Sequence, residues 1–367
     1  MRKIKFGMVG AGFMGQRAHL SNFAALPNVE VVALAEPRKE LAKRVAEQYH
    51  IPRIYASHQE LAEDREVEAV AAILPHLSNA TVAADLLKAK KHVLVEKPIA
   101  GSAHQAEELA RLAAENDRIM MVGVMKRYDA GVELAQQRIA DWLRTSEMGQ
   151  PLFVKALCYG GDWICNVDRP LISTGEAPPP PPVSPDPKSW QNEDGPAFLP
   201  PSGRQEFQRF TNIFIHNLNL IRYLMPKRFE AVSARIGAKT MAAMLHFGED
   251  TAAVLEGAFV PSHGWQEETR VVFEKGWLDL FTPPPLLINV PARVVIHQMG
   301  PQPLVLEPKA PWSWAFRRQA EHFAAAVADY QPGSFTTAVR SPAADALEDM
   351  RLAEAIFRAD SKYVKEA

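Results

Sequence analysis

Three groups of residues in this chain have the types and the spacing to do chemistry. The first is the run Gly10-Ala11-Gly12-Phe13-Met14-Gly15, which fits G-x-G-x-x-G and stands between an apolar run and a helical pattern. There Gly10 would allow a tight turn, Gly12 would let a pyrophosphate approach the backbone, and Gly15 would let helix and strand pack closely. The free N–H groups of the helix start would bind the phosphates. The run predicts a dinucleotide site.

Glu36 ends the second apolar run, at the position about 20 residues on where such sites carry an acid. A carboxylate there accepts hydrogen bonds from both ribose hydroxyls and repels a 2′-phosphate, so Glu36 favours NAD over NADP. Arg38, two residues later, could pair with that phosphate instead. NADP therefore stays open as the cofactor.

The second group, Glu96-Lys97-Pro98, closes another apolar run. Ligands of parallel sheets bind at the carboxyl ends of the strands, so Lys97 is expected where a nicotinamide ring would lie. An amine there could move a proton or hydrogen-bond a substrate hydroxyl. The alternative is a surface lysine at a strand end.

The third group lies in residues 210–225, which are predicted to form one helix that is apolar almost all the way round. At about 100° per residue, one narrow stripe of that helix carries Asn212, His216, Asn219 and Tyr223. Taken alone, His216 fits a hydrogen-bonded interior histidine better than a catalytic group. Its polar neighbours favour a stripe that faces a wet pocket.

The elements that must position these residues change in kind after residue 125. Before it, apolar runs at residues 4–9, 29–35, 69–74, 92–96 and 119–124 alternate with helical patterns at 16–25, 38–49, 79–90 and 103–115, the last with a capping box at Ser102 and Gln105. Continuous apolar runs are typical of a parallel sheet covered on both faces. Residues 1–125 are therefore predicted to form a doubly wound α/β domain.

Residues 126–367 are predicted to form a second, α+β domain. After a helix at 129–144, β-rich runs at 151–159, 229–238, 241–247, 252–260, 269–273 and 277–281 alternate apolar with polar residues, as antiparallel sheets do. Helices are expected at 314–329 and 343–361. The Pro-rich run 178–201 is expected to be an exposed loop, or alternatively a lid or a subunit-contacting arm.

Composition excludes several classes of protein. With 47% hydrophobic and 23% charged residues the chain is globular, and 41 basic against 43 acidic residues argue against a nucleic-acid partner. No apolar run approaches the roughly 20 residues that span a bilayer, so no membrane association is expected. Two cysteines at no recognised zinc spacing indicate a reducing cytoplasm and no metal site.

These motifs together resemble the glucose-fructose oxidoreductase, inositol dehydrogenase and rhizopine-catabolism family (Gfo/Idh/MocA). The likeness rests on the glycine turn, the run 91–98 that ends in Glu96-Lys97-Pro98, Lys126-Arg127-Tyr128 after Gly123, and the late helix that bears His216. It implies a Rossmann domain followed by a domain with a large open, mostly antiparallel sheet, which binds substrate and mediates oligomerisation. By position Lys97 matches the catalytic or substrate-binding lysine, His216 the acid/base histidine and Pro75 a loop proline near the nicotinamide.

The chain departs from the family pattern at three positions. Asn212 and Asn219 stand where aspartates are frequent around the histidine, and Asn79 replaces a histidine four residues after the loop proline. An amide cannot stabilise an imidazolium as a carboxylate does, so Lys97 is expected to carry more of the proton transfer.

The resemblance implies hydride transfer between nicotinamide and a secondary hydroxyl of a sugar or cyclitol, in a homodimer or homotetramer. Two other readings stay open: a glycoside hydrolase that oxidises its substrate transiently with bound NAD, and a dinucleotide-binding regulator without turnover. Expected catalytic residues are Lys97, His216 and Asn212; Phe13, Met14 and Glu96 join the cofactor contacts. Further substrate contacts are expected from Arg127, Tyr128, Asp162, Trp163 and Tyr223.

Overall fold

The computed structural model describes residues 2–165, 171–260 and 264–364, and the chain divides into two compact units. The first unit holds residues 1–124, 168–196 and 316–350; the second holds the remainder. The sequence predicts one change of domain after residue 125. The contacts differ from this, because they join two later segments to the first unit, one of which carries most of the Pro-rich run.

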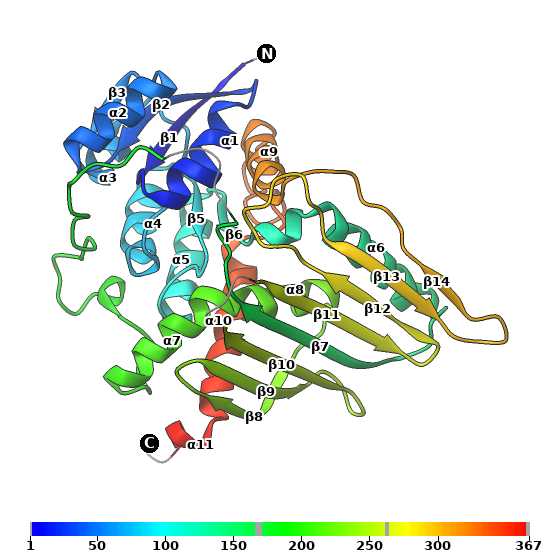
Figure 1. Ribbon diagram of the computed structural model, residues 1–367. Helices are drawn as coiled ribbons and strands as arrows, with labels where there is room; N and C mark the ends of the chain where they lie inside the picture. Colours follow the sequence, from blue (N-terminus) through cyan, green and yellow to red (C-terminus); the bar gives the residue numbers. More distant parts are fainter. Residues whose placement is uncertain (1, 166–170, 261–263, 365–367) are drawn as a thin grey trace. The chain divides into compact units, whose positions relative to one another are not determined.

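The first unit is built on a six-stranded sheet in the order β3-β2-β1-β4-β5-β6, with parallel pairing throughout the described strands. The strands are β1 (Ile4–Val9), β2 (Val29–Ala35), β3 (Arg53–Tyr55), β4 (Ala69–Ala72), β5 (His92–Glu96) and β6 (Met120–Gly123). Every residue of β4, β5 and β6 is buried, which confirms the predicted doubly wound sheet (Figure 1). Strand order reverses between β1 and β4, the position where such sheets bind ligands.

Helices connect these strands close to the predicted positions, except that the helix at residues 58–63, like the strand β3, was not predicted. They are η1 (Gly15–Leu20), α1 (Ser21–Ala24), α2 (Lys39–Tyr49), α3 (His58–Glu63), α4 (Asn79–Lys88) and α5 (Ala103–Asn116). The Ser102 hydroxyl oxygen accepts the N–H of Gln105 at 3.1 Å, as the capping box predicts. The Gln105 side chain differs from that prediction, because its Oε1 accepts the N–H of Gly101, at 2.8 Å.

A cluster of phenylalanine rings explains why a late helix belongs to the first unit. The rings of Phe6 on β1 and Phe23 on α1 stack with their centroids 4.2 Å apart. Phe323, on α9 (Ala315–Ala328), lies edge-on to both, at 6.2 and 6.3 Å. Aromatic burial of this kind is a large part of core stability, so α9 completes the core of the sheet domain.

The buried His92 on β5 makes the stability of the first unit depend on pH. Its Nδ1 accepts the N–H of Ile119 at 3.1 Å and its ring packs against Tyr330, so the folded state holds it neutral. Burial, with the Arg118 guanidinium, lowers the pKa of His92 to about 4.

We therefore expect the unfolding free energy to fall as the pH drops from about 6.5 to 4. In this range His92 is protonated in the unfolded chain but stays neutral in the folded state. The full loss attributable to His92 is about 3 kcal/mol, and it is absent above pH 6.5. Urea unfolding of wild type and His92→Asn across this range measures it, since the asparagine oxygen can accept the same N–H without titrating. Parallel pH profiles for the two proteins would contradict the assignment.

The second unit contains an eight-stranded sheet in the order β14-β13-β12-β11-β7-β10-β9-β8. Its strands are β7 (Pro151–Gly160), β8 (Glu230–Ile236), β9 (Thr240–His246), β10 (Ala252–Phe259), β11 (Gln266–Phe273), β12 (Gly276–Phe281), β13 (Arg293–Gln298) and β14 (Leu304–Leu306). All neighbours are antiparallel except β7 and β10. Exposure alternates along β9 and β11, which confirms the predicted mostly antiparallel sheet with two different faces.

Helices cover the buried face of this sheet. α6 (Ala130–Thr145) packs against β12 and β13, and α8 (Ile215–Leu224) packs against β7 (Figure 1). The remaining helices are α7 (Pro201–Ile213), α10 (Ala343–Arg358) and α11 (Ser361–Val364). Asp129 caps α6, because its Oδ1 accepts the N–H groups of Gly131 and Val132 at 2.8 and 3.1 Å.

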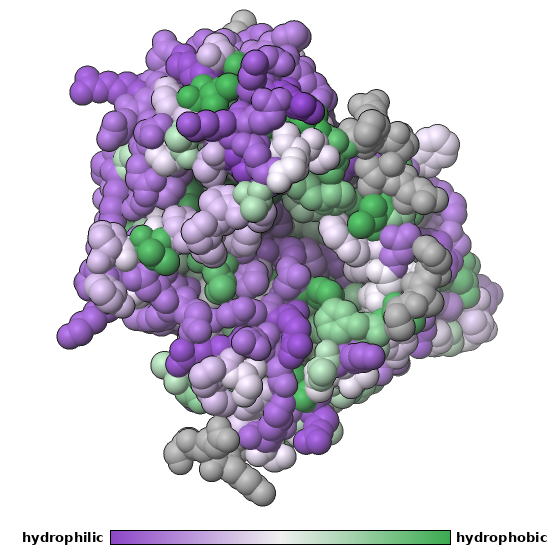
Figure 2. Space-filling view, turned by 60° about the vertical axis from the view of Figure 1, so that its left-hand side comes forward, coloured by the Kyte–Doolittle hydropathy of each residue, from purple (hydrophilic) through white to green (hydrophobic). Residues whose placement is uncertain are grey.

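The visible surface is dominated by polar residues, with apolar patches scattered among them (Figure 2). In the described parts of the chain, no helix combines the length and the apolar character that crossing a bilayer requires. Both cysteines, Cys158 and Cys165, are free thiols.

Candidate functional site

The glycine turn after β1 needs glycine at two positions for steric reasons. Gly10 has a φ of +89°, and a Cβ there would lie 2.5 Å from the carbonyl oxygen of Ile73. A Cβ on Gly15 would lie 2.6 Å from the carbonyl oxygen of Gly10. Gly12 has no atom within 4 Å of its Cβ position, so the backbone there is open to a ligand. This arrangement matches the three glycine roles of a dinucleotide turn.

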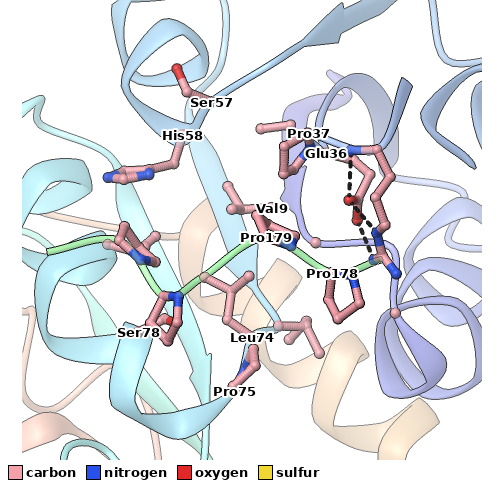
Figure 3. A pocket seen from close by; sticks show the side chains of 18 of the residues that line it. Val9, Glu36, Pro37, Ser57, His58, Leu74, Pro75, Ser78, Pro178 and Pro179 are labelled. Atoms are coloured by element: carbon pink, nitrogen blue, oxygen red, sulfur yellow. Dashed lines mark hydrogen bonds and ion pairs between the residues drawn. The ribbon is translucent and has the colours of Figure 1, made fainter. Parts of the chain in front are cut away.

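A cavity of about 470 Å³ opens beside this turn, at the carboxyl ends of β1, β2 and β4. Its walls come from the strand ends, from the loop that carries Ser57 and His58, and from the Pro-rich run (Figure 3). Gly10, Gly12, Glu36, Arg38 and Pro75 all line it. The cavity lies where the strand order reverses, so its position fits the adenosine half of a dinucleotide.

Glu36 is buried at the end of β2 and accepts four hydrogen bonds. Ala11 N–H donates to it at 2.8 Å, and Arg38 donates from its backbone N–H at 3.2 Å and from its guanidinium in two bonds of 2.8 Å. Burial alone would raise the pKa of Glu36, but the bonds from Arg38 and Ala11 outweigh it and hold the pKa below its usual value. Glu36 is therefore ionised at neutral pH and holds Arg38 against itself.

Lys97 is half-buried at the end of β5, and its segment is fixed by two buried side chains. The amide Nδ2 of Asn79 donates to the carbonyl oxygens of Glu96 and Pro98, at 2.8 and 2.9 Å. The Glu96 carboxylate contacts His19 Nε2 at 2.7 Å and accepts the N–H of Lys97 at 3.2 Å. The peptide bond between Lys97 and Pro98 is cis. Asn79 thus holds the lysine-bearing turn in place.

His76, in the short helix η2 (His76–Ser78) next to Pro75, is a site residue that the sequence reasoning missed. Burial lowers its pKa, and the nearby Lys97 ammonium lowers it further, so the imidazole is neutral beside the lysine. Its Nε2 is buried and has no hydrogen-bond partner among the described residues. The available signal was its place directly after β4, at the same sheet edge as Lys97.

In the second unit the structure brings two predicted substrate residues, Arg127 and Tyr223, together with Asn219 of the predicted polar stripe. Arg127, in η3 (Met125–Tyr128), donates from Nε to Oδ1 of Asn219 at 2.7 Å. Its guanidinium lies over the ring of Tyr223, 5.0 Å from the ring centre. Arg127, Tyr128 and Asn219 are buried and Tyr223 is partly exposed. This cluster offers a cation, an amide and a phenol to polar ligands.

The predicted single helix over residues 210–225 is wrong, because α7 and α8 meet at Phe214. The Phe214 ring packs directly on Gly257 of β10, where a Cβ would lie 2.2 Å from it. The break divides the polar stripe: Asn212 lies in the last turn of α7 and is exposed, while His216 is half-buried in the first turn of α8.

The two remaining predicted substrate residues lie just after β7. Asp162 Oδ1 accepts the N–H groups of Ile164 and Cys165 at 3.0 and 3.1 Å, so it shapes a turn. Trp163 is 37% exposed. The substrate contacts of Asp162 and Trp163 stay a prediction.

A buried ion pair in the second unit was also missed. Glu267 on β11 is fully buried and pairs with Lys126 Nζ. Asn217 Nδ2 and Trp265 Nε1 donate to its two oxygens at 3.2 and 3.3 Å. The sequence signal that could have found Glu267 was its place in the alternating pattern of β11, where it shares the buried face with Thr269, Val271 and Phe273. The cluster is close to Cys158, where burial and the Glu267 charge raise the thiol pKa to about 12.

Among the described residues, no group of three or more histidine, cysteine or carboxylate side chains could hold a metal ion. The structure therefore offers a dinucleotide cavity and buried polar clusters as its candidate sites.

The chain is similar to known oxidoreductases. Residues 4–124 match the GFO_IDH_MocA model, described as "Oxidoreductase family, NAD-binding Rossmann fold". Inositol 2-dehydrogenase of Salmonella paratyphi B is 30% identical over 170 residues, 46% of this chain and 49% of that protein. The chain thus matches about half the length of that relative.

Two solved structures share the fold over 98% of this chain. KijD10, a 3-ketoreductase from Actinomadura kijaniata in complex with NADP and TDP-benzene, has a TM-score of 0.71 and 20% identity, with 98% of its own chain covered. Aldose-aldose oxidoreductase from Caulobacter crescentus, complexed with glycerol, has a TM-score of 0.70 and 22% identity, with 97% covered.

Proposed function

Since residues 4–124 belong to the Gfo/Idh/MocA oxidoreductase family with its NAD-binding Rossmann fold, we propose that the protein transfers hydride between a nicotinamide dinucleotide and a secondary hydroxyl of a sugar, sugar derivative or cyclitol. One observation carries the proposal. The open glycine turn and the 470 Å³ cavity lie at the same sheet edge as the end of β5, where Lys97 stands. A dinucleotide in that cavity would direct its nicotinamide along this edge.

Lys97 is the proposed proton-transfer group. When bound, the nicotinamide ring supplies hydride acceptance or donation. Lys97 in its amine form would take the proton of the substrate hydroxyl as the carbinol carbon loses hydride, and its ammonium form would return a proton in the reverse direction. Asn79 and Glu96 hold the backbone of Lys97 so that the amine keeps its direction. The neutral His76 beside it adds no competing cation.

Substrate hydroxyls are proposed to contact the polar residues of the second unit. Arg127 and Tyr223 supply donors from one cluster, and His216 lies one helical turn before Asn219 on α8. We propose His216 as a second acid or base, with Tyr128, Asp162 and Trp163 as further contacts. Asn212, exposed at the end of α7, is proposed to contact the outer part of the substrate.

The test combines cofactor binding with a substrate screen. Calorimetric titration with NAD and NADP is expected to show binding of a dinucleotide, and a library of polyols and sugars is expected to contain one that produces NADH or NADPH. Glycoside cleavage without net accumulation of reduced cofactor would instead identify a hydrolase that oxidises transiently. Binding without turnover of any polyol or glycoside would identify a regulator.

We also propose that the open face of the second sheet mediates self-association. That face carries aromatic and apolar side chains beside charged ones, including Phe153, Met244, Val272 and Trp277. Mixed surfaces of this kind are typical of protein interfaces. Light scattering with Trp277→Glu, which puts a charge in the middle of the face, is expected to show smaller particles than wild type.

A further inference from the structure

The Pro-rich run belongs to a segment, residues 172–193, that is attached to the first unit near both of its ends; we call it the strap. At its start, Gln16 Nε2 donates to the Ile172 carbonyl at 2.9 Å and the Ile172 N–H donates back to Gln16 Oε1 at 3.0 Å. At its end, Glu193 accepts from the Ser102 hydroxyl at 2.7 Å and pairs with His104 Nδ1 at 2.6 Å. The strap is therefore an integral wall of the first unit.

Between these attachments, the strap forms part of the cavity assigned to the cofactor. Pro178 to Pro182 line it opposite the ends of β1, β2 and β4 (Figure 3). Proline fixes φ and lacks an N–H, so this wall is stiff and offers the ligand no amide donors. Any dinucleotide in the cavity would lie against it.

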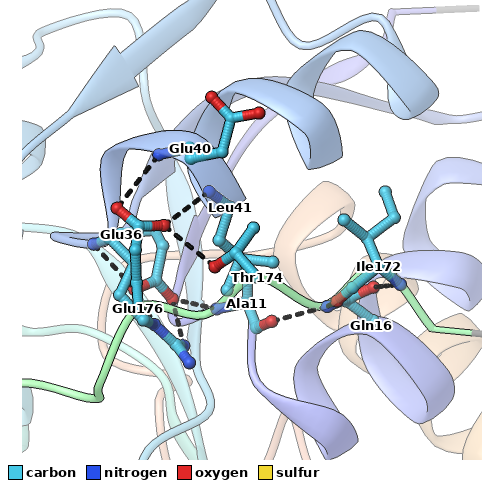
Figure 4. A network of polar contacts seen from close by, with 9 residues as sticks. Ala11, Gln16, Glu36, Glu40, Leu41, Ile172, Thr174 and Glu176 are labelled. Carbon is cyan, nitrogen blue, oxygen red and sulfur yellow. Dashed lines mark hydrogen bonds and ion pairs between the residues drawn. The ribbon is translucent and has the colours of Figure 1, made fainter.

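Glu176 lies two residues before these prolines, and its side chain binds the N-terminal end of α2. Its Oε1 accepts the N–H of Glu40 at 3.2 Å, and its Oε2 accepts the N–H of Leu41 at 3.0 Å and the Thr174 hydroxyl at 2.9 Å (Figure 4). Although partial burial works to raise the pKa of Glu176, these bonds and the Arg38 charge lower it on balance. The Glu176 carboxylate is thus an anion from the protein itself that binds the N–H groups at the start of α2.

Arg38, the residue that could pair with a 2′-phosphate according to the sequence, is ion-paired with Glu36 and lies within the electrostatic influence of Glu176. Glu36 holds its guanidinium in two hydrogen bonds, and the Glu176 charge acts on it as well; both raise the pKa of Arg38. A 2′-phosphate would therefore lie near two carboxylates. The arginine beside it is already paired with Glu36, and the N–H groups of Glu40 and Leu41 already have an acceptor.

We propose that Glu176 is a second specificity-determining residue for the dinucleotide, which acts with Glu36 to admit NAD and exclude NADP. The inference rests on the proposed binding of a dinucleotide in this cavity. Glu36 repels a 2′-phosphate and holds the Arg38 guanidinium, and Glu176 adds a second negative charge and occupies the N–H groups of Glu40 and Leu41. The second specificity-determining residue thus comes from a segment about 140 positions further along the chain than Glu36.

The experiment compares wild type with Glu176→Gln, using direct binding as the readout. Calorimetry with NAD, NADP, ADP and adenosine 2′,5′-bisphosphate separates the 2′-phosphate from the rest of the ligand. Glutamine keeps an acceptor for the N–H groups but removes the charge, so NADP and adenosine 2′,5′-bisphosphate should bind about tenfold more tightly. NAD and ADP should change less than about threefold. Glu193→Gln, at the other end of the strap, is the matched control and should leave the preference unchanged.

The outcomes are distinguishable. If Glu176→Gln and Glu193→Gln alter NAD and NADP binding by the same factors, Glu176 only fastens the strap and the proposal is wrong. If wild type binds NADP as tightly as NAD, there is no exclusion to explain and the proposal is wrong as well. If wild type binds neither dinucleotide, the proposed function fails together with it. Thermal unfolding of each variant confirms that the fold is intact.

Discussion

Replacing Lys97 by alanine is expected to reduce turnover at least a hundredfold while the affinity for NAD changes by no more than a few-fold. Loss of a positioned proton-transfer group costs about 10²–10⁴ in rate. Lys97 follows the last residue of β5 and does not line the cavity, whereas Gly10, Gly12 and Glu36 do. Its removal should therefore leave cofactor binding almost unchanged. Steady-state kinetics on the identified polyol and calorimetry with NAD measure the two quantities.

Two further measurements separate proton transfer from a structural role of this lysine. Small primary amines added to Lys97→Ala should restore part of the turnover, because they can enter the space left by the side chain and accept the proton. Lys88→Ala, an exposed lysine on α4, is the matched control and should behave as wild type. Full activity of Lys97→Ala would remove this residue from the mechanism.

The parts of the site that the sequence predicts are those whose determinants are local. Gly10 and Gly15 are required by contacts within a few residues or with the neighbouring strand, and Glu36 and Lys97 follow buried strands directly. A buried parallel strand is read from its apolar run, and its carboxyl end is then known. The cofactor half of the candidate site was therefore open to prediction, including five of the six strands of the sheet that carries it; the short strand β3 was not predicted.

The determinants that the sequence did not predict come from distant segments. Nothing near residue 176 indicates that its carboxylate accepts the N–H groups of α2, because that contact depends on the path of the whole strap. Phe323 belongs to the first unit through two rings near the N-terminus. The ring of Phe214, where the two helices meet, occupies the space that a side chain at Gly257 would fill. Each of these needs a tertiary contact that periodicity does not report.

Arg38 shows how such contacts decide a question that local reasoning leaves open. From the sequence, Arg38 could bind a 2′-phosphate or be irrelevant to the cofactor. The structure gives it a bidentate bond to Glu36 and a second carboxylate nearby. A bidentate arginine–carboxylate pair is among the stronger polar interactions in proteins. The proposed preference for NAD therefore depends on how Arg38, three residues after β2, is held, and we expect the preference to weaken when Glu176 loses its charge.

The buried Glu267 leads to the largest expected effect on stability. Glu267→Ala should lower the unfolding free energy of the second unit by about 3–5 kcal/mol, since it leaves the Lys126 ammonium buried without its carboxylate. Asn217 and Trp265 would also lose an acceptor. Urea unfolding followed by tryptophan fluorescence measures the change. Glu268→Ala, the next residue on β11 and on its opposite, partly exposed face, is the control and should change stability by less than about 1 kcal/mol.

The double variant Lys126→Met with Glu267→Leu tests the cause of that loss. The loss of stability in Glu267→Ala is expected to come from the Lys126 ammonium, which is left buried without its carboxylate. If so, replacing both residues by apolar side chains of similar volume should recover most of the unfolding free energy, as apolar replacement of buried ion pairs often does. If the double variant is as unstable as the single one, shape and packing around β11 account for the loss. A single variant that unfolds within 1 kcal/mol of wild type would mean that water reaches Lys126 once Glu267 is removed, and that the cluster contributes little to the stability of the second sheet.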